Sequence, residues 1–212
     1  NCELLGIDLS KVDIAIISHS HLDHIGGLDY LMEVNPEFAL FLPHDVTLGA
    51  HYYDSDSRYL RNIPYRHTNT TFIREHTEIF PGIVLIATKS SLVGWFSKYP
   101  PHEKKPKFYG LPELSLALKG NDGKWILISG CSHSGIEEII KETRYFLGKD
   151  VSLVVGGFHH RHYSSAYINS IAGLMKNELN VEQVAPTHCT GKESLKIFED
   201  LYKADFHYFG LG

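Results

Sequence analysis

The sequence predicts an α/β fold in which strand-length apolar segments alternate with helices. Three apolar runs in the second half of the chain each lead through a short turn into a segment of helix length, which is the pattern of a strand–turn–helix unit. A histidine-rich loop follows directly after the apolar run 12–17. In addition, 212 residues with 43% hydrophobic content bury a substantial core. We therefore expect a single α/β domain over residues 1–212.

The first half of the chain predicts a β–loop–α–β arrangement. Residues 1–10 have the pattern of a helix end, and residues 12–17 form a buried strand. A helix over 28–34 begins after a Gly-Gly pair and stops at an Asn-Pro pair, before a second buried strand over 38–42. Residues 51–71 mix tyrosines and arginines without a clean period. They indicate surface structure over the site, either an ordinary helix and loop or a lid that contacts substrate.

The middle of the chain predicts a strand and a hairpin. Residues 83–87 form an apolar strand. Residues 114–119 alternate apolar and polar side chains, Asn-Asp-Gly makes a tight turn, and 125–128 is the returning strand. Segment 89–109, which lies between them, is too long and too rich in proline for a simple connector, so it predicts a loop that is either functional or disordered.

Three strand–turn–helix units complete the chain. The predicted strands are 125–128, 151–155 and 184–185, the predicted helices are 136–147, 165–179 and 193–202, and residues 206–209 are a last short strand. Each of the three turns carries a histidine. We expect these turns and the first histidine-rich loop to converge on one face of the molecule.

The loop after the first strand has the composition of a metal site. It reads His-x-His-x-Asp-His and supplies His19, His21, Asp23 and His24 within six positions. Neutral imidazole suits zinc, copper, iron and nickel, while a carboxylate adds charge and a hard oxygen. The mixture favours a divalent transition metal. His19 and His21 can point one way from an extended segment while Asp23 and His24 aim at a second point, so this loop can begin two adjacent sites.

This motif resembles the signature of the metallo-β-lactamase superfamily. The resemblance implies an αββα four-layer sandwich with one or two metals at its edge. Because members of the superfamily begin with further strands, we expect an N-terminally truncated chain that lacks its first strands. The segments Gly-Cys-Ser-His-Ser-Gly-Ile, Gly-Gly-Phe-His and Pro-Thr-His-Cys-Thr-Gly resemble the dihydropteroate-synthase-like branch, which includes archaeal dihydropterin/ribofuranosylaminobenzene phosphate synthase-like proteins.

The resemblance also implies two sets of metal ligands. These sets are His19, His21 and His133, and Asp23, His24 and His188. For His133 and His188 the alternative is a hydrogen-bonded imidazole that orients a ligand, since metal sites require such partners as well. The expected cofactor is one or two divalent ions, with zinc first and manganese, iron or magnesium as alternatives.

Other site residues are assigned less directly. Asp23 is expected to accept a proton besides binding metal. His159 follows a Gly-Gly pair that permits close backbone approach, and it is either a further ligand or a substrate-binding or acid/base group. Cys131 stands where many members of the superfamily carry a bridging Asp, and it is either a soft-metal ligand or a buried apolar residue. His160 and His162 are expected at the surface of their loop.

A phosphate-binding role is predicted for the lysines of the long loop. Lys104, Lys105 and Lys107 are interleaved with aromatic residues that can stack on a flat ring. Backbone amides around Ser134 and Thr190, at predicted helix starts, are expected to complete the anion site. The alternative is a solvated basic loop with no ligand.

The composition argues against several function classes. A net charge of −5 speaks against a general nucleic-acid binder, and no apolar run reaches the length that spans a bilayer. Three widely spaced cysteines favour a reducing compartment over a disulfide framework. We therefore expect a cytoplasmic protein that contacts neither nucleic acid nor membrane.

The predicted activity is metal-dependent hydrolysis of a small anionic substrate that is phosphorylated or cyclic. In this prediction the metals lower the pKa of bound water and polarise a carbonyl or phosphoryl oxygen. The alternative implied by the branch is a transferase that condenses a dihydropterin methyl diphosphate with an aryl amine. A non-catalytic metal-binding scaffold and a metal-dependent nuclease are the remaining hypotheses, and the oligomeric state stays open.

Overall fold

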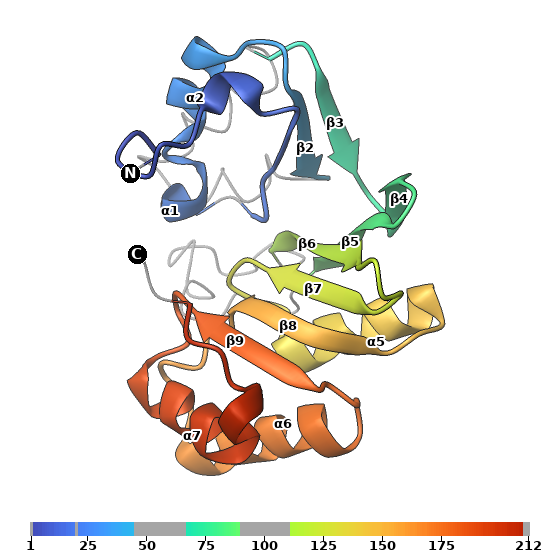
Figure 1. The fold of residues 1–212 in the computed structure, drawn as a ribbon, viewed down its shortest axis with the longest axis vertical. Coiled ribbons are helices and arrows are strands. Elements are labelled where there is room, and N and C mark those ends of the chain that lie inside the picture. The colour runs from blue at the N-terminus through green and yellow to red at the C-terminus, as the bar shows by residue number, and fades with distance from the viewer. Residues whose placement is uncertain (1, 20, 45–66, 90–110, 210–212) are drawn as a thin grey trace, which may run out of the picture.

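The computed structural model describes residues 2–19, 21–44, 67–89 and 111–209, and it contains two separate sheets (Figure 1). The first sheet is parallel, with strand order β1-β2-β3. Its strands are β1 (Ile14–Ile16), β2 (Ala39–Pro43) and β3 (Thr70–Ile73). The second sheet has six strands in the order of the chain. They are β4 (Thr77–Phe80), β5 (Ile83–Lys89), β6 (Pro112–Lys119), β7 (Trp125–Ser129), β8 (Val151–Gly157) and β9 (Gln183–Thr187).

The second sheet changes from antiparallel to parallel at β7. Strands β4 to β7 are joined antiparallel, and β6 and β7 form the predicted hairpin around Asn121-Asp122-Gly123. Strands β7, β8 and β9 are parallel, because a helix crosses over between each pair. The predicted strand–turn–helix units are therefore confirmed.

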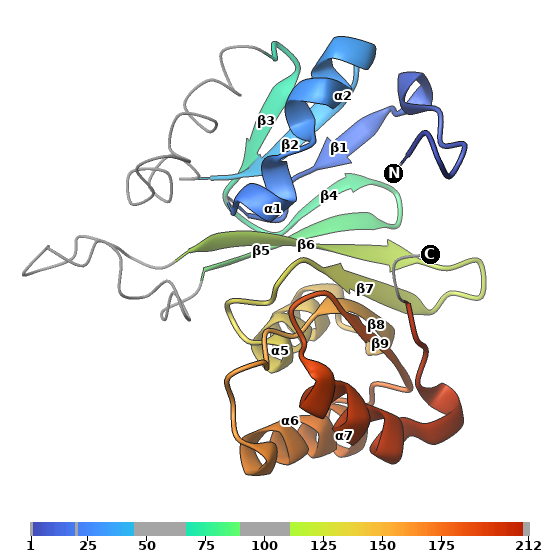
Figure 2. The same cartoon turned by 90° about the vertical axis from the view of Figure 1, so that its left-hand side faces the viewer.

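Helices cover the outer faces of both sheets (Figure 2). Helices α1 (Leu22–Ile25) and α2 (Leu28–Val34) lie on the three-stranded sheet. Helices α5 (Ile136–Leu147), α6 (Ser165–Asn177) and α7 (Lys192–Tyr202) lie on the six-stranded sheet. The layers run helix, sheet, sheet, helix, which confirms the predicted αββα sandwich.

The spacing of buried residues explains why these three long helices form where they do. In α5 the residues Ile136, Ile139, Ile140 and Thr143 are buried, an i, i+3, i+4, i+7 pattern that places them on one face. Helix α6 repeats this spacing from Ile168 to Met175. Each helix thus turns one apolar stripe toward the sheet and its charged residues toward solvent.

Each interface between layers has its own hydrophobic cluster. Leu28 of α2 packs with Phe38, Leu40 and Leu42 on the outer side of the first sheet. Between the sheets, Ile73, Leu85 and Leu114 pack with Ile16 and Phe41. The largest cluster joins the six-stranded sheet to α5, α6 and α7, and it includes Leu127, Val154, Ile140, Ala172 and Phe198. Burial on both sides of each sheet fixes its strand register, because a slip by one residue would turn apolar side chains to the wrong face.

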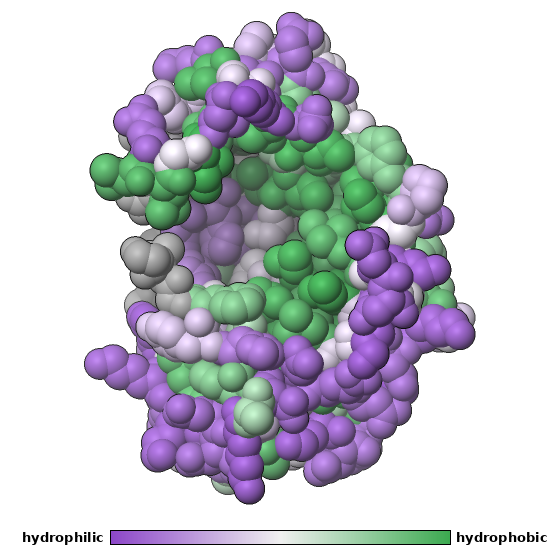
Figure 3. All heavy atoms as spheres, in the orientation of Figure 1, coloured by the Kyte–Doolittle hydropathy of each residue, from purple (hydrophilic) through white to green (hydrophobic). Residues whose placement is uncertain are grey.

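The two sheets do not cover each other completely. Figure 3 shows apolar surface in the hollow between the part of the molecule built on β1–β3 and the part built on β6 and β7. In agreement with this, Ile128 of β7 remains 38% exposed. The sandwich is therefore open on the side that Figure 1 presents.

Three local predictions differ from the structure. Residues 2–6 form turns and are followed by a 3-10 helix, Leu9–Lys11, where the end of a helix was expected. Strands β3 and β4 were not predicted, since each has four residues of which only two are apolar. Residues 206–209 make only an isolated bridge between Phe206 and Val184, because the chain leaves the sheet after that pair and Tyr208 is exposed.

Among the described helices, none combines the length and apolar character that crossing a membrane requires. Most of the predicted long loop 89–109 and most of the aromatic segment 51–71 lie outside the described residues.

Candidate metal centre

The predicted donors meet at one edge of the sandwich. Strands β7, β8 and β9 run parallel, so their carboxyl ends lie at the same edge, and the turns after them carry His133, His159 and His188. The histidine-rich loop after β1 is joined to β6 by a backbone hydrogen bond of 2.7 Å from the Leu114 N–H to the Ser18 carbonyl. Turns that are far apart in the chain therefore lie together.

Among the described residues, five overlapping groups of histidine, cysteine and aspartate side chains lie closely enough to hold an ion, and two of these groups are the predicted ligand sets. Within each set all donor atoms lie within 4.8 Å of one another. The sets are His19, His21 and His133, and Asp23, His24 and His188. Nε2 of His19 is 3.0 Å from Nδ1 of His21, and Nε2 of His24 is 3.2 Å from Nε2 of His188. The structure thus brings together the members of both ligand sets that the sequence predicts.

Burial keeps the imidazoles of the first set neutral. It lowers the pKa of His21 to about 4 and the pKa of His133 to about 2, and it holds the pKa of His19 well below its usual range. For His19 and His133 the neighbouring imidazoles add to this effect, because positive charges side by side repel each other. Neutral imidazole is the form that binds metal ions.

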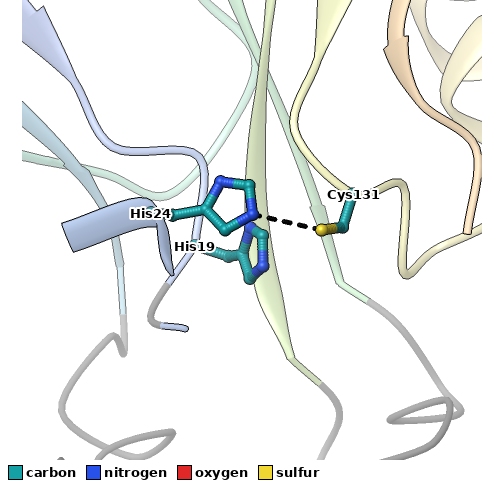
Figure 4. Close-up of side chains that lie close together, drawn as sticks. All are labelled: His19, His24 and Cys131. Atoms are coloured by element: carbon teal, nitrogen blue, oxygen red, sulfur yellow. Dashed lines mark hydrogen bonds between the residues drawn. The ribbon is translucent and has the colours of Figure 1, made fainter. Parts of the chain in front are cut away.

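The second set converges on the same small region. Oδ2 of Asp23 is 3.2 Å from Nε2 of His188 and 3.5 Å from Nε2 of His24. The same His24 nitrogen is 3.1 Å from Sγ of Cys131, and His19 lies beside this pair (Figure 4). Imidazole nitrogens, a carboxylate and a thiol that face one another suit a divalent cation of borderline softness. The residues present therefore fit one or two such ions.

The same three turns each contain a residue other than glycine with a positive φ angle. Ser132, His159 and His188 have φ values of 58°, 53° and 51°, in the left-handed region that side chains other than glycine rarely adopt. Each of them lies in one of the turns that follow β7, β8 and β9. Unfavourable backbone conformations persist where the surrounding structure holds them, and they concentrate at functional sites.

Two glycines allow these turns to approach one another. At Gly156 a Cβ atom would lie 2.1 Å from the Ser129 carbonyl oxygen, and φ is +133°. At Gly157 a Cβ atom would lie 2.7 Å from Sγ of Cys189 and 2.7 Å from the Gly130 carbonyl oxygen. The Gly-Gly pair thus permits the close backbone approach that the sequence predicts.

Cys131 and Cys189 form a thiol pair beside the histidines. Sγ of Cys189 lies 3.6 Å from the Cys131 carbonyl oxygen. A hydrogen bond between the two thiols lowers the pKa of Cys189 and raises that of Cys131, so Cys189 ionises first. Cys131 is buried, and the contact of its sulfur with His24 leaves both of its predicted roles open.

Glu113, on β6, is a site residue that sequence reasoning missed. It is 3% exposed, and its two carboxylate oxygens accept hydrogen bonds of 2.8 Å from the backbone N–H groups of His133 and Ser134. The Ser134 hydroxyl donates a third hydrogen bond of 2.9 Å. Glu113 thereby holds the turn that presents His133. The one available signal was a charged residue directly before the predicted strand 114–119.

The same contacts bear on the predicted substrate-binding role of Ser134, which stays a prediction. Its N–H and hydroxyl are both used by Glu113, and the Gly135 N–H bonds to the Ser132 carbonyl. The amides of Ser134 and Gly135, just before α5, are therefore bonded to groups of the protein itself.

The side chain of Thr190 is used within the protein, while the predicted role of the backbone amides around it stays a prediction. Its side chain is fully buried, its hydroxyl donates to the Thr187 carbonyl at 2.6 Å, and it accepts from the Phe158 N–H at 3.0 Å. The side chain ties two turns together and has no surface for a substrate. The other predicted substrate-binding residues, Lys104, Lys105 and Lys107, lie outside the described residues.

The histidines after His159 separate into one buried and one exposed residue. The prediction that His160 lies at the surface is wrong. It is 3% exposed, its Nδ1 is 3.0 Å from the Ser194 hydroxyl, and its ring stacks on Phe198. His162 is exposed as expected. The loop packs on α7 at His160, a contact that no local pattern encodes.

The donor groups open into a cavity of about 560 Å³. It is lined by His21, Asp23, Cys131, His133, His159, Arg161, His162, His188 and Cys189. Arg161 was not predicted as a site residue. The cavity has room for a small molecule beside the metal centre.

Comparisons with known proteins agree with this architecture. A family model described as the metallo-beta-lactamase superfamily matches residues 2–147. A 7,8-dihydropterin-6-methyl-4-(beta-D-ribofuranosyl)-aminobenzene-5'-phosphate synthase of Methanocaldococcus jannaschii is 28% identical over 237 residues, which cover 100% of this chain and 78% of the relative.

Solved structures show the same fold. The structure of Tm1679, a metal-dependent hydrolase of the beta-lactamase superfamily, superposes with a TM-score of 0.72 at 26% identity, over 99% of this chain and 81% of that one. An isothiocyanate hydrolase from Delia radicum gut bacteria gives a TM-score of 0.58 at 14% identity, over 96% and 76% of the two chains.

The fold, the site and these relatives define a class of protein. The chain belongs to the metallo-beta-lactamase superfamily, which generally binds divalent metal ions. It is an enzyme of that superfamily, and both a hydrolase and a transferase are compatible with this assignment.

Proposed function

We propose that this protein is a metal-dependent enzyme that hydrolyses a small anionic substrate at a two-ion centre. The observation that carries this proposal is the pair of donor sets that share one cavity. Each set supplies three donor atoms within 4.8 Å of one another, and the cavity beside them has a volume of about 560 Å³. Three protein ligands per ion leave a position open for water or substrate, as catalytic zinc sites require.

The two sets divide the proposed ligands by their chemistry. The all-imidazole set, His19, His21 and His133, would hold one ion in a buried position. The set Asp23, His24 and His188 would hold the other ion nearer to solvent. Bound zinc-like ions supply Lewis-acid chemistry, in that they polarise a carbonyl or phosphoryl oxygen and make water acidic enough to attack at neutral pH.

Asp23 and His159 are the proposed proton-transfer residues. The Asp23 side chain is 58% exposed and lines the cavity, so its second oxygen can accept a proton from an attacking group. His159 lines the same cavity, and its ring centroid is 4.3 Å from that of His133. In this role it donates a proton to the leaving group.

Metal counting on histidine variants tests the two-ion centre. We expect zinc-loaded wild-type protein to hold two ions, and His19→Ala and His24→Ala to lose the ion of their own set first. The two variants should also lower turnover of phosphoesters or lactones by at least about tenfold, the scale on which disturbed metal binding reduces activity.

His207→Ala is the matched control for these variants. The ring of His207 bonds to Gln183 at 3.0 Å and belongs to neither donor set, so metal content and turnover should equal those of wild type. If neither His19→Ala nor His24→Ala changes the zinc content, the proposed centre is wrong. Equal loss of both ions from both variants would contradict the division into two sets.

A transferase is the second candidate, and one observation favours it. The relative from Methanocaldococcus jannaschii is named as a synthase and is aligned over the whole of this chain. In that case the same centre would bind the diphosphate that leaves while an aryl amine attacks. Incubation with a dihydropterin methyl diphosphate and an aryl amine separates the readings: a joined product indicates the transferase, and release of diphosphate without joining indicates the hydrolase.

A further inference from the structure

The loop between β8 and α6, residues 158–163, places one arginine in the metal cavity. Buried residues at two positions fix this loop. Phe158 is 1% exposed, and its N–H donates to the Thr190 hydroxyl at 3.0 Å. His160 is buried against Phe198 and has its Nδ1 3.0 Å from the Ser194 hydroxyl. The loop is therefore attached to the start of α7 and to the turn before it.

The backbone of Arg161 packs against Gly191, the residue directly before α7. A Cβ atom at Gly191 would lie only 3.0 Å from Cα of Arg161, and Gly191 has φ +87°. The Tyr163 N–H bonds to the His160 carbonyl at 3.0 Å and closes the turn around Arg161. A fixed backbone under a long side chain lowers the entropy that is lost when the side chain binds a ligand.

The charges of the cavity favour an anion next to Arg161. Of the lining residues, Arg161 alone carries a permanent positive charge, and Asp23 alone carries a carboxylate. Asp23 lies against His24 and His188, and within the described part of the chain Arg161 forms no ion pair with it or with any other acid. The guanidinium thus lines an open cavity without an anionic partner from the described residues.

We propose that Arg161 binds the anionic group, a phosphate or a carboxylate, of the small molecule whose reacting bond lies at the metal centre. The planar guanidinium presents paired N–H donors that match the oxygens of either group. This inference rests on the proposed function, which supplies the reaction at the metal centre. It adds that the substrate carries an anionic group, which Arg161 binds at a distance from the reacting bond. Arg161 determines specificity in this role and takes no part in proton transfer.

Titration of inorganic phosphate and of acetate into the protein, followed by calorimetry, tests the inference. Arg161→Gln should weaken binding of the preferred anion by at least about tenfold, the loss expected for one charge-assisted contact. Arg161→Lys should retain part of the affinity, because the charge remains and the paired donors are lost. Of phosphate and acetate, the anion that binds wild type more tightly identifies the group that Arg161 recognises.

Lys192→Gln is the matched control. Lys192 is exposed, adjoins Gly191 and does not line the cavity, so the variant removes the same charge nearby and should bind the anion as wild type does. Equal weakening in Arg161→Gln and Lys192→Gln would show a general charge effect and overturn the proposal. Unchanged affinity in Arg161→Gln, or a wild type that binds neither anion, would overturn it as well.

The zinc content of the same samples separates this inference from the proposed function. Titrations are made on both zinc-loaded and metal-free protein. If wild type holds no zinc, the proposed metal centre fails, while the difference between Arg161→Gln and Lys192→Gln in metal-free protein still decides the role of Arg161. If zinc content is normal and that difference is absent, the inference alone fails.

Discussion

At the scale of single residues, several buried polar side chains hold the turns and loops that carry the site residues. Glu113 holds the turn that carries His133 through hydrogen bonds to two backbone amides. His160 holds the loop that carries His159 and Arg161. Buried polar groups of this kind are costly to leave without partners, so their removal should affect stability as well as the site.

Glu113→Ala should lower the free energy of unfolding by about 3 kcal/mol, because it leaves two buried amide donors without an acceptor. Glu113→Gln keeps one acceptor oxygen and should cost roughly half as much. Urea unfolding of the metal-free proteins measures both. Glu182→Ala, which removes an exposed ion pair with Lys124, is the control and should change stability by less than about 1 kcal/mol. A Glu113→Ala protein as stable as this control would contradict the positioning role.

His160 should make stability depend on pH. Burial lowers its pKa in the folded protein to about 4. When the pH falls below the usual histidine value of about 6.5, the unfolded chain takes up a proton at this position and the folded protein does not, so the free energy of unfolding decreases. Above that value both states are neutral and the effect is absent.

The size of this effect follows from the pKa difference. Between about pH 7 and pH 5, metal-free wild type should lose about 2 kcal/mol more than His160→Gln, since each unit of pKa difference corresponds to about 1.4 kcal/mol. Urea unfolding at the two pH values provides the measurement. Parallel pH dependences of wild type and variant would rule out this role for His160.

At the scale of elements, the site depends on how closely neighbouring strands approach. Gly156 and Gly157 end β8, where backbone or sulfur atoms of the adjoining turns occupy the space that a side chain would need. The parallel order β7-β8-β9 then brings three histidine-bearing turns to one edge. The position of the donors is thus a property of strand packing.

Gly156→Ala should destabilise the protein by more than about 3 kcal/mol, because the new Cβ would meet the Ser129 carbonyl oxygen at 2.1 Å and φ is positive. Gly173→Ala is the matched control, since its nearest atom would be Nδ2 of Asn177 at 3.9 Å. As an alanine in the helix α6 it should be neutral or stabilise by up to about 1 kcal/mol. Thermal unfolding of both variants makes the comparison, and equal melting temperatures would refute the close-packing argument.

At the scale of the whole molecule, the candidate centre joins the two sheets. Its donors come from the loop after β1, in the first sheet, and from turns after β7 and β9, in the second. An ion bound there would add a link between segments that also meet in the cluster between the sheets and at the hydrogen bond from Leu114 to Ser18. Metal binding should therefore stabilise the complete fold.

Removal of metal should lower the melting temperature, and zinc should restore it. A ligand that binds only the folded state stabilises it by about 4 kcal/mol at a thousandfold excess over its dissociation constant. Calorimetric scans with a chelator and with added zinc measure this shift. The double variant His19→Ala/His24→Ala, which loses a donor from each set, should show little shift. A zinc-dependent shift of wild-type size in this variant would place the stabilising ion elsewhere.

The sequence by itself determined the elements and the short metal motif. The apolar periods predicted most strands and the three long helices, and His19, His21, Asp23 and His24 lie within six positions, so chain connectivity alone keeps them close. Local pattern also predicted the hairpin and the Gly-Gly close approach. These features depend on neighbours in the chain, which the sequence displays directly.

Only the tertiary structure decided which distant residues meet. The support of His133 by Glu113 and the place of Arg161 in the cavity both depend on strand order and register. The burial of His160 and Thr190 depends on the same packing. Contacts between residues far apart in the chain arise from the packing of complete layers, and a local pattern of hydrophobic and polar residues carries no information about which layer a given turn will face.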